Sequence, residues 1–228
     1  MDSFFSAHKT IAPAIPLGVH IALIVGVLIA IVISLQYYQS QTVTRFFRAL
    51  QWVQVIVLYS WYVLCSFEWS ISLPLYHCRI AMFAILLVPN HFRFKQYFAL
   101  MGVFGSIVSF IYPVLDVYDF PHVTQFSFIV GHYALLINSL IYLLQTISTQ
   151  SFSLKKCMYW ILGMNAVLVI VNQLTGGDYG FLTKLPLLNT TQVPLNYSLL
   201  SIILIIACYG VHKLLQWYYQ TKITISTR

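Results

Sequence analysis

The stretch LGVHIALIVGVLIAIVISL, residues 17–35, contains no charged residue and is long enough to cross a lipid bilayer as a helix. Similar apolar runs recur along the 228-residue chain. Helices are the expected structure because every backbone N–H and C=O group in lipid must be satisfied within its own segment. The sequence therefore predicts an all-α, polytopic membrane protein, a bundle of about seven transmembrane helices that forms a single domain over residues 1–228. The predicted spans are 17–38, 47–66, 72–89, 96–113, 121–146, 156–174 and 197–218.

The composition supports lipid as the solvent of this chain. Hydrophobic residues make up 60% and charged residues 7% of the sequence, whereas a soluble domain has about 25% charged residues. The net charge of +7 and the isoelectric point near 9.2 are explained by basic cytoplasmic loops, so no nucleic-acid partner is expected. Four cysteines are too few for a disulfide framework. We expect no metal site, no cofactor and no cleavable signal peptide.

The charged residues separate into two groups along the chain. The acids fall in the N-terminus or in even-numbered loops: Asp2, Glu68, Asp116, Asp119 and Asp178. Most bases fall in odd-numbered loops or the C-terminus: Arg45, Arg48, Arg93, Lys95, Lys155, Lys156, Lys213, Lys222 and Arg228. Lys9 and Lys184 lie with the acids, and Arg79 lies within a span. Because Lys and Arg mark the cytoplasmic side, we predict a multi-pass cell-membrane protein with its N-terminus outside and its C-terminus in the cytoplasm.

Polar residues concentrate in the outer halves of the predicted spans and in the loops beside them. A charged group facing lipid at a helix centre would cost roughly 2–3 kcal/mol, so one pocket that opens outward is the simplest arrangement for these groups. Only His132 lies deeper, near the middle of the membrane. The outer residues are His20, Glu68, His77, Cys78, Arg79, Asp116, His122, Gln125, Asn172 and Asp178.

The third span contains the clearest candidate nucleophile, Cys78. Ser72 would cap this helix and Pro74 would occupy its first turn, which places Cys78 about one turn further in. A helix N-terminus beside Arg79 and His77 favours a thiolate, the form that attacks in cysteine catalysis. The alternatives are a small core residue or a disulfide with Cys65 at the end of the preceding span.

The fifth span offers candidate general bases. Gln125 and His132 are seven residues apart and share one helix face, while His122 lies about 80° away around the helix axis. A histidine inside lipid needs a partner or a water, and it can act as a base near neutral pH. The alternative is a structural histidine that bridges two helices. Gly131 is expected to let a neighbouring helix approach closely.

The segment 175–196 is the longest external loop and a candidate lid or re-entrant segment. Asp178 and the glycines around it are typical of a turn near the membrane surface, which is an alternative to a functional role. Asn189 and Asn196 begin Asn-X-Ser/Thr triplets, which matter only in a secretory context. Cys157 is either an acylation site or a bystander that faces lipid.

These segments together resemble the transmembrane protein 164 family, integral-membrane acyltransferases with many small bacterial relatives. The resemblance runs in order over residues 70–215, most of the chain. Its most specific motif is Leu73-Pro-Leu-Tyr-His-Cys78. The other matching segments are Phe120-Pro-His122 with His132, and Asn172 followed by Gly176, Asp178-Tyr179, Phe181-Leu182 and Lys184-Leu-Pro186.

The resemblance implies that Cys78 carries an acyl group and that His132 is its paired base, while His122 matches a recurrent family histidine. The chain departs from the family at one position. Tyr76 stands where the family has a histidine two residues before the cysteine, and His77 stands one residue before it. On a helix this change moves the imidazole by about 100°.

The sequence thus predicts a lipid acyltransferase that forms a cysteine thioester in a pocket open to the outer leaflet, with a membrane phospholipid as acyl donor or acceptor. Backbone N–H groups at the start of the third span, Tyr76 or Asn172 would stabilise the oxyanion. The alternatives are a non-catalytic protein that binds a lipid or small molecule, and a small-solute transporter. The supporting or substrate-binding residues are predicted to be Tyr76, His77, Arg79, His122, Gln125, Asn172, Asp178 and Glu68.

Overall fold

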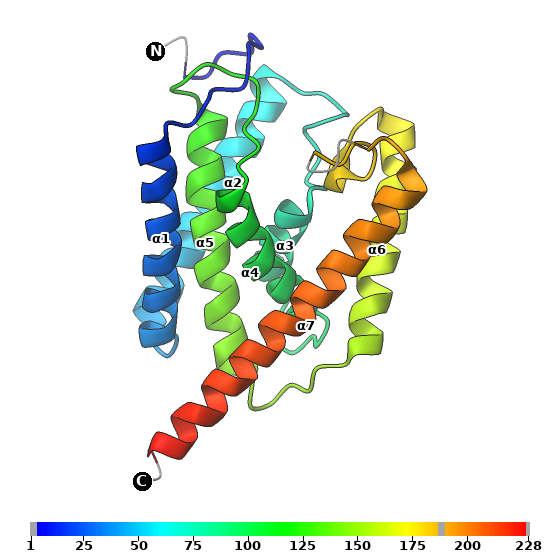
Figure 1. Ribbon diagram of the computed structural model, residues 1–228. Coiled ribbons are helices and arrows are strands. Elements are labelled where there is room, and N and C mark those ends of the chain that lie inside the picture. The colour runs from blue at the N-terminus through cyan, green and yellow to red at the C-terminus, as the bar shows by residue number, and fades with distance from the viewer. Residues whose placement is uncertain (1–3, 187–189, 227–228) are drawn as a thin grey trace.

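The computed structural model describes residues 4–186 and 190–226, and this part of the chain folds into seven α-helices and one short 3-10 turn (Figure 1). Strand-like pairing within these ranges is limited to a single bridge between Leu185 and Thr190. Asp2, Asn189 and Arg228 lie outside the described residues. The helices are α1 Leu17–Tyr37, α2 Gln41–Cys65, α3 His77–Leu87, α4 Lys95–Ile111, α5 Val123–Thr146, α6 Leu154–Thr175 and α7 Val193–Ser226, with η1 at Tyr179–Phe181.

The helices confirm the all-α membrane fold. Four of them, α1, α5, α6 and α7, are long and apolar enough to cross a membrane. Most predicted boundaries agree within two residues, but α2 begins six residues before the predicted 47, and α7 extends beyond both ends of the predicted 197–218. The third span is the largest error, because α3 has only 11 residues where 18 were predicted, at 72–89.

Helix α5 is the centre of the bundle. It packs against α1, α2, α3 and α4 and also contacts α7, while α6 and α7 pair with each other and α7 joins the rest mainly through α4. Most side chains of α5 are buried, as expected for a helix surrounded by other helices. Gly131 allows close approach at the contact with α2, because a Cβ on it would lie 2.9 Å from the side chain of Gln54. The prediction for Gly131 is therefore confirmed.

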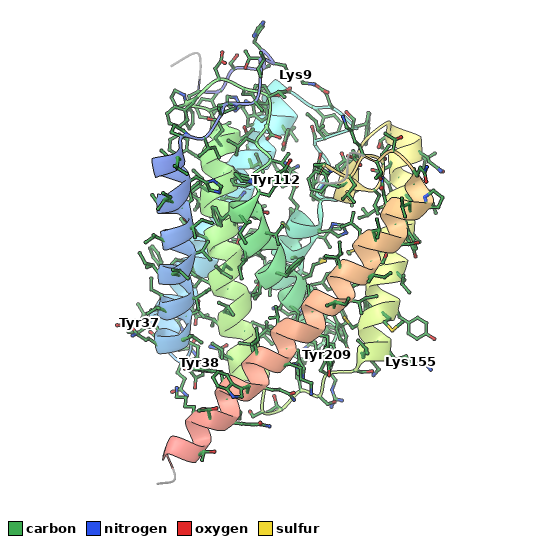
Figure 2. All side chains as sticks on the ribbon, in the orientation of Figure 1. Lys9, Tyr37, Tyr38, Tyr112, Lys155 and Tyr209 are labelled. Carbon is green, nitrogen blue, oxygen red and sulfur yellow. The ribbon has the colours of Figure 1, made fainter. Side chains whose placement is uncertain are left out.

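The two chain termini lie at opposite ends of the bundle (Figure 1). The end near the N-terminus also holds the connections after α2, α4 and α6, which carry Glu68, Asp116, Asp119 and Asp178. Lys9 lies at this end and Lys155 toward the other (Figure 2). The structure thus places the acids that it describes at one end, as the sequence predicts.

Helix α3 is too short to span a bilayer. Eleven residues extend about 16 Å, roughly half of a hydrocarbon core of about 30 Å. The chain covers the remaining depth with residues 66–76, which descend from the N-terminal end of the bundle without forming a helix (Figure 1). Such backbone is tolerated at membrane depth only where protein or water satisfies its polar groups.

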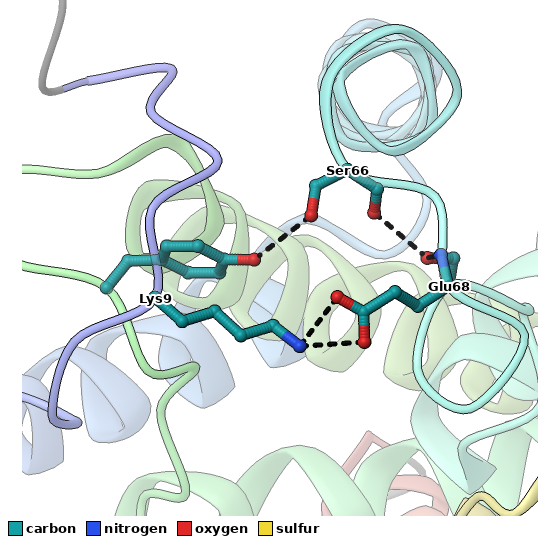
Figure 3. A network of polar contacts seen from close by, with 5 residues as sticks. Lys9, Ser66 and Glu68 are labelled. Carbon is teal, nitrogen blue, oxygen red and sulfur yellow. Dashed lines mark hydrogen bonds and ion pairs between the residues drawn. The ribbon is translucent and has the colours of Figure 1, made fainter.

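Residues 4–10 are fastened across the N-terminal end of the bundle. The carbonyl of Phe5 accepts a hydrogen bond from the Trp61 indole at 3.0 Å, and Lys9 forms an ion pair of 2.6 Å with Glu68 (Figure 3). The same network includes Ser66, whose carbonyl accepts a bond of 3.4 Å from the Ser72 hydroxyl. The N-terminal segment is therefore tied directly to residues 66–76.

Candidate functional site at the start of α3

The first turn of α3 presents unpaired backbone donors inside the bundle. Tyr76 is the N-cap residue and its side chain forms no capping bond. The first helical bond at this end runs from Ile80 N–H to the Tyr76 carbonyl at 2.9 Å. Among the described residues, no acceptor meets the N–H groups of His77, Cys78 and Arg79. A helix terminus leaves such groups free for a ligand unless a side chain caps them.

The predicted start of this helix is wrong. Ser72 does not cap α3; its hydroxyl accepts a hydrogen bond from the Glu68 N–H at 2.9 Å within the preceding segment. Pro74 also lies before the helix rather than in its first turn. As a result, Cys78 is the second residue of α3, closer to the unpaired N–H groups than the sequence predicts.

The thiol of Cys78 faces α4. Its Sγ lies 3.8 Å from the Ser109 hydroxyl, and a Cβ placed on Gly105 would lie 2.8 Å from the sulfur. Gly105 therefore makes room for the thiol. Both Cys78 and Cys65 are free thiols, and Cys65 is exposed at the end of α2, so the alternative of a disulfide between them does not hold in this structure.

His132 contacts the same part of α4 through the residue next to Ser109. Its ring is 6.0 Å from the ring of Phe110, the residue after Ser109, and 4.5 Å from that of Phe128. The Nδ1 atom lies 2.7 Å from the Phe128 carbonyl, and because a carbonyl only accepts, Nδ1 carries the proton. In the neutral imidazole Nε2 is then the acceptor, the state that a general base requires.

No hydrogen bond joins Cys78 to His132 in the described parts of the chain. Their side chains meet consecutive residues of α4, Ser109 and Phe110. The carbonyl of Phe110 also receives a bond of 2.8 Å from His20 Nε2, which ties α1 to this part of α4. Both predicted catalytic residues therefore contact α4.

His77 faces away from the thiol, toward α6. Its Nε2 donates to the Oδ1 atom of Asn165 at 2.8 Å, and the Asn165 amide donates to the Ser201 hydroxyl at 2.9 Å. Gly180, with φ of 71°, packs against the ring, since a Cβ there would lie 2.6 Å from His77 Cε1. The imidazole is thus held by α6, α7 and η1.

Arg79 points toward α2. Its guanidinium donates to the Tyr62 hydroxyl at 2.8 Å and to the Ile71 carbonyl at 3.0 Å. It also lies over the rings of Tyr62 and Tyr76, at 5.2 and 4.9 Å from their centroids. Tyr76 in turn packs edge-on against Tyr179. His77, Cys78 and Arg79 therefore point to three different neighbours, as the 100° step of a helix requires.

Tyr179 holds residues 66–76 in place. Its hydroxyl accepts from Leu73 N–H at 3.0 Å and donates to the Trp69 carbonyl at 2.7 Å. Asn172 fixes Tyr179 in turn, because its Oδ1 and Nδ2 bond the Tyr179 N–H and C=O at 2.8 and 3.0 Å. Oδ1 and one N–H of Asn172 are thus engaged by Tyr179, and a role of the remaining N–H at an oxyanion stays a prediction.

Asp178 forms the turn after α6. Its Oδ1 accepts hydrogen bonds from the N–H groups of Thr183 at 2.7 Å and Lys184 at 3.2 Å. Burial raises the pKa of the Asp178 carboxyl above its ordinary value, although these donors act in the opposite direction. The side chain therefore has the turn role that the sequence offered as an alternative.

Three predicted site residues lie elsewhere, at the N-terminal end of the bundle. His122 is the N-cap of α5, and both ring nitrogens are bonded, Nδ1 to Thr124 and Nε2 to the Ser6 carbonyl at 3.0 Å. Gln125 completes a capping box by accepting from the His122 N–H at 3.1 Å. Glu68 is in its ion pair with Lys9. His122, Gln125 and Glu68 therefore do not share one site with Cys78, contrary to the sequence prediction, but form a separate polar group.

The sequence analysis missed Ser109 and Asn165, the direct partners of Cys78 and His77. It also missed a buried polar chain between α2 and α5, in which Gln51 donates to Gln54 at 2.7 Å and Gln54 to Ser127 at 2.6 Å. A polar side chain within an apolar helix was the available signal for Asn165. Ser109 gave no comparable signal, because small hydroxyls are common in membrane helices.

Comparison with known proteins identifies a family. No curated protein and no solved structure matches the chain. A profile of the TMEM164 family matches residues 4–212, which include every element of the site around α3. Because this match extends over most of the 228 residues, the chain belongs to the TMEM164 family.

Proposed function

We propose that this membrane protein is a lipid acyltransferase that carries the acyl group on Cys78 as a thioester. The observation that carries the proposal is the position of Cys78, at the second residue of a helix that starts inside the bundle with unpaired N–H groups. The positive end of a helix stabilises negative charge. The same N–H groups are suitable donors to the oxyanion of an acyl-transfer intermediate.

In the first half-reaction, His132 Nε2 takes the proton of the Cys78 thiol, and the sulfur attacks the carbonyl carbon of a phospholipid acyl ester. The intermediate collapses by breaking the ester C–O bond, and the protonated His132 returns its proton to the alkoxide that leaves. The products are a lysolipid and the Cys78 thioester. A small movement of α3 or α5, or a water, has to connect Cys78 and His132 for this transfer.

In the second half-reaction, His132 removes the proton of an acceptor hydroxyl, whose oxygen attacks the thioester carbonyl. The C–S bond breaks and the thiol regains the proton. Ser109, beside the sulfur at 3.8 Å, donates to the thiolate each time it forms. Splitting the transfer in two lets one site serve both donor and acceptor.

The site would be reached from the outer leaflet. Residues 66–76 descend to α3 from the end of the bundle that carries the acids, and the distribution of Lys and Arg assigns that end to the outside. In this proposal the seven helices form one multi-pass domain of the cell membrane. The phospholipid reaches α3 laterally from the outer half of the bilayer.

Intact mass spectrometry of the purified protein tests the acyl-enzyme. After incubation with phospholipid, wild-type protein should gain one acyl chain that hydroxylamine removes, while Cys78→Ala should gain none. Cys65→Ser is the matched control, because Cys65 is exposed and outside the site; it should load normally. A lipid-binding protein without catalysis would form no adduct, and an adduct that persists in Cys78→Ala would refute the mechanism.

A pair of histidine variants tests the assignment of the base. His132→Asn should slow acyl loading by about 10²–10⁴-fold, the usual contribution of a general base. His122→Asn should load at nearly the wild-type rate, because Asn still caps a helix N-terminus and both nitrogens of His122 are already bonded. If His122→Asn loads much more slowly than His132→Asn, then His122 and not His132 is the general base.

A further inference from the structure

Arg79 is a cation inside the bundle without an acidic partner. Within residues 4–186 and 190–226, the structure forms one carboxylate ion pair, between Lys9 and Glu68. The charge of Asp116 acts on Arg79 only from beyond the distance of an ion pair. The partners of the guanidinium are neutral: the Tyr62 hydroxyl, the Ile71 carbonyl and two aromatic rings. A charge within a membrane span is costly and is normally paired or functional.

The position of Arg79 on α3 makes this charge more unusual. Cations are favourable at the C-terminus of a helix and unfavourable at its N-terminus. At the far end of α3 the normal rule holds, because Arg48 and Lys95 donate to the carbonyls of Leu86 and Val88 at 2.8 and 2.7 Å. Arg79, the third residue of α3, instead adds its charge to the positive end of the helix.

The surroundings of Arg79 leave donors for an anion. A guanidinium has five N–H groups, of which the Ile71 carbonyl and the Tyr62 hydroxyl take two. The Tyr59 hydroxyl lies beside Arg79 and interacts with it electrostatically and as a weak side-chain contact, but it forms no hydrogen bond of ordinary geometry among the residues described. Positive charge and unused polar groups thus occur together beside the candidate nucleophile.

We propose that Arg79 recognises the phosphate of the lipid whose acyl ester Cys78 attacks, and so selects phospholipids over neutral glycerolipids. This inference rests on the proposed acyl transfer. Arg79 directly follows Cys78 in the first turn of α3, so a phosphate bound here lies at the same end of the helix as the candidate nucleophile. The glycerol backbone keeps a phosphate only a few bonds from each acyl ester, and guanidinium binds phosphate through paired hydrogen bonds.

Binding without turnover tests this recognition. Purified Cys78→Ala protein in detergent is titrated calorimetrically with dihexanoyl phosphatidylcholine and with dihexanoylglycerol, which differ in the phosphate head group. We expect at least tenfold tighter binding of the phospholipid, and loss of that preference in Cys78→Ala/Arg79→Gln with affinity for the neutral lipid unchanged. Cys78→Ala/Lys184→Gln, which removes an exposed cation at the same end of the bundle, should keep the preference.

Arg79 also supports residues 66–76 through Ile71, so a second variant guards against misfolding. Cys78→Ala/Arg79→Lys retains the charge but not the planar fork, and its preference should fall at least threefold. A preference that survives in both Arg79 variants would overturn the proposal. Inorganic phosphate should compete with the phospholipid for binding to the Cys78→Ala protein, which retains Arg79. Competition would identify the phosphate as the recognised group. If inorganic phosphate does not compete, the rest of the head group is recognised and the proposal fails.

The two proposals fail in different ways. If the phospholipid preference depends on Arg79 but wild-type protein never forms a thioester, phosphate recognition stands and acyl transfer does not. If wild-type protein loads equally from phospholipid and diacylglycerol, and Arg79→Gln loads as well as wild type, acyl transfer stands and phosphate recognition fails.

Discussion

The thiol of Cys78 lies 3.8 Å from the hydroxyl of Ser109, so the candidate nucleophile of α3 has its direct polar contact on α4. A hydroxyl that donates to sulfur stabilises the thiolate, and a hydrogen bond to a charged group contributes about 1.5–3 kcal/mol. Ser109→Ala should therefore slow acyl loading by about tenfold. Ser106→Ala, one turn earlier, removes a buried hydroxyl without a partner among the described residues and should load normally. If both variants load the acyl chain at the same rate, Ser109 does not stabilise the thiolate.

Gly105 is predicted to be necessary for the position of the thiol. A Cβ there would lie 2.8 Å from Cys78 Sγ, and overpacking of this kind typically costs about 1–3 kcal/mol. Gly105→Ala should lower the thermal unfolding midpoint and slow acyl loading. Gly163→Ala is the control, because nothing lies within 4 Å of its added Cβ on α6; there, Ala should stabilise the helix by about 0.5–1 kcal/mol. If both variants behave alike, the packing argument fails.

Tyr179→Phe should loosen residues 66–76 without removing any residue near Cys78. The variant leaves Leu73 N–H and the Trp69 carbonyl without their partner, and the loss of a partly buried hydrogen bond costs about 0.5–1.5 kcal/mol. We expect faster hydrogen exchange at Leu73 and a lower unfolding midpoint. Tyr159→Phe, at a side chain that is 67% exposed, is expected to change neither. Unchanged exchange at Leu73 in Tyr179→Phe would mean that the segment is held by other contacts.

Asp178 predicts a pH dependence of stability. Burial raises its pKa in the folded protein, so the folded state binds the proton more tightly than the unfolded state. The stabilising contribution is complete at acidic pH, below the pKa of the unfolded carboxyl, and is lost as the pH rises through the raised value. Asp178→Asn, which keeps an oxygen acceptor for Thr183 and Lys184, should remove this dependence in unfolding measurements from pH 4 to 8.

Asp178→Ala distinguishes charge from hydrogen bonding in that experiment. It removes the charge and the acceptor together, so it should be less stable than Asp178→Asn at every pH. If Asp178→Asn keeps the wild-type pH profile, another group is responsible for it.

The apolar runs predict the fold well because lipid imposes a simple rule on helices. The limits of α1, α5 and α6 follow from where their apolar runs start and stop. Helix α3 does not follow this rule, since Leu73-Pro-Leu-Tyr76 is as apolar as a helix but forms an irregular segment with bends. What makes that conformation stable is the hydroxyl of Tyr179, far away in sequence. Hydropathy contains no information about such a partner.

The site was predictable in its residue types more than in its contacts. The sequence predicts that His122 and Gln125 share a pocket, although their spacing of three residues is also typical of a capping box, which is what the structure forms. The contact between Cys78 and Ser109 depends on how α3 is rotated against α4. That rotation is determined by packing across the whole bundle, which one sequence does not reveal.

The short α3 also has a consequence for how the protein enters the membrane. An 11-residue helix that begins with a charged residue in its first turn, Arg79, is a poor substrate for independent insertion, which favours about 20 apolar residues. Leu73 N–H and the Trp69 carbonyl gain their hydrogen-bond partner only after Tyr179 has been synthesised. The segment between α2 and α3 therefore reaches its complete hydrogen bonding only when α6 and η1 are in place.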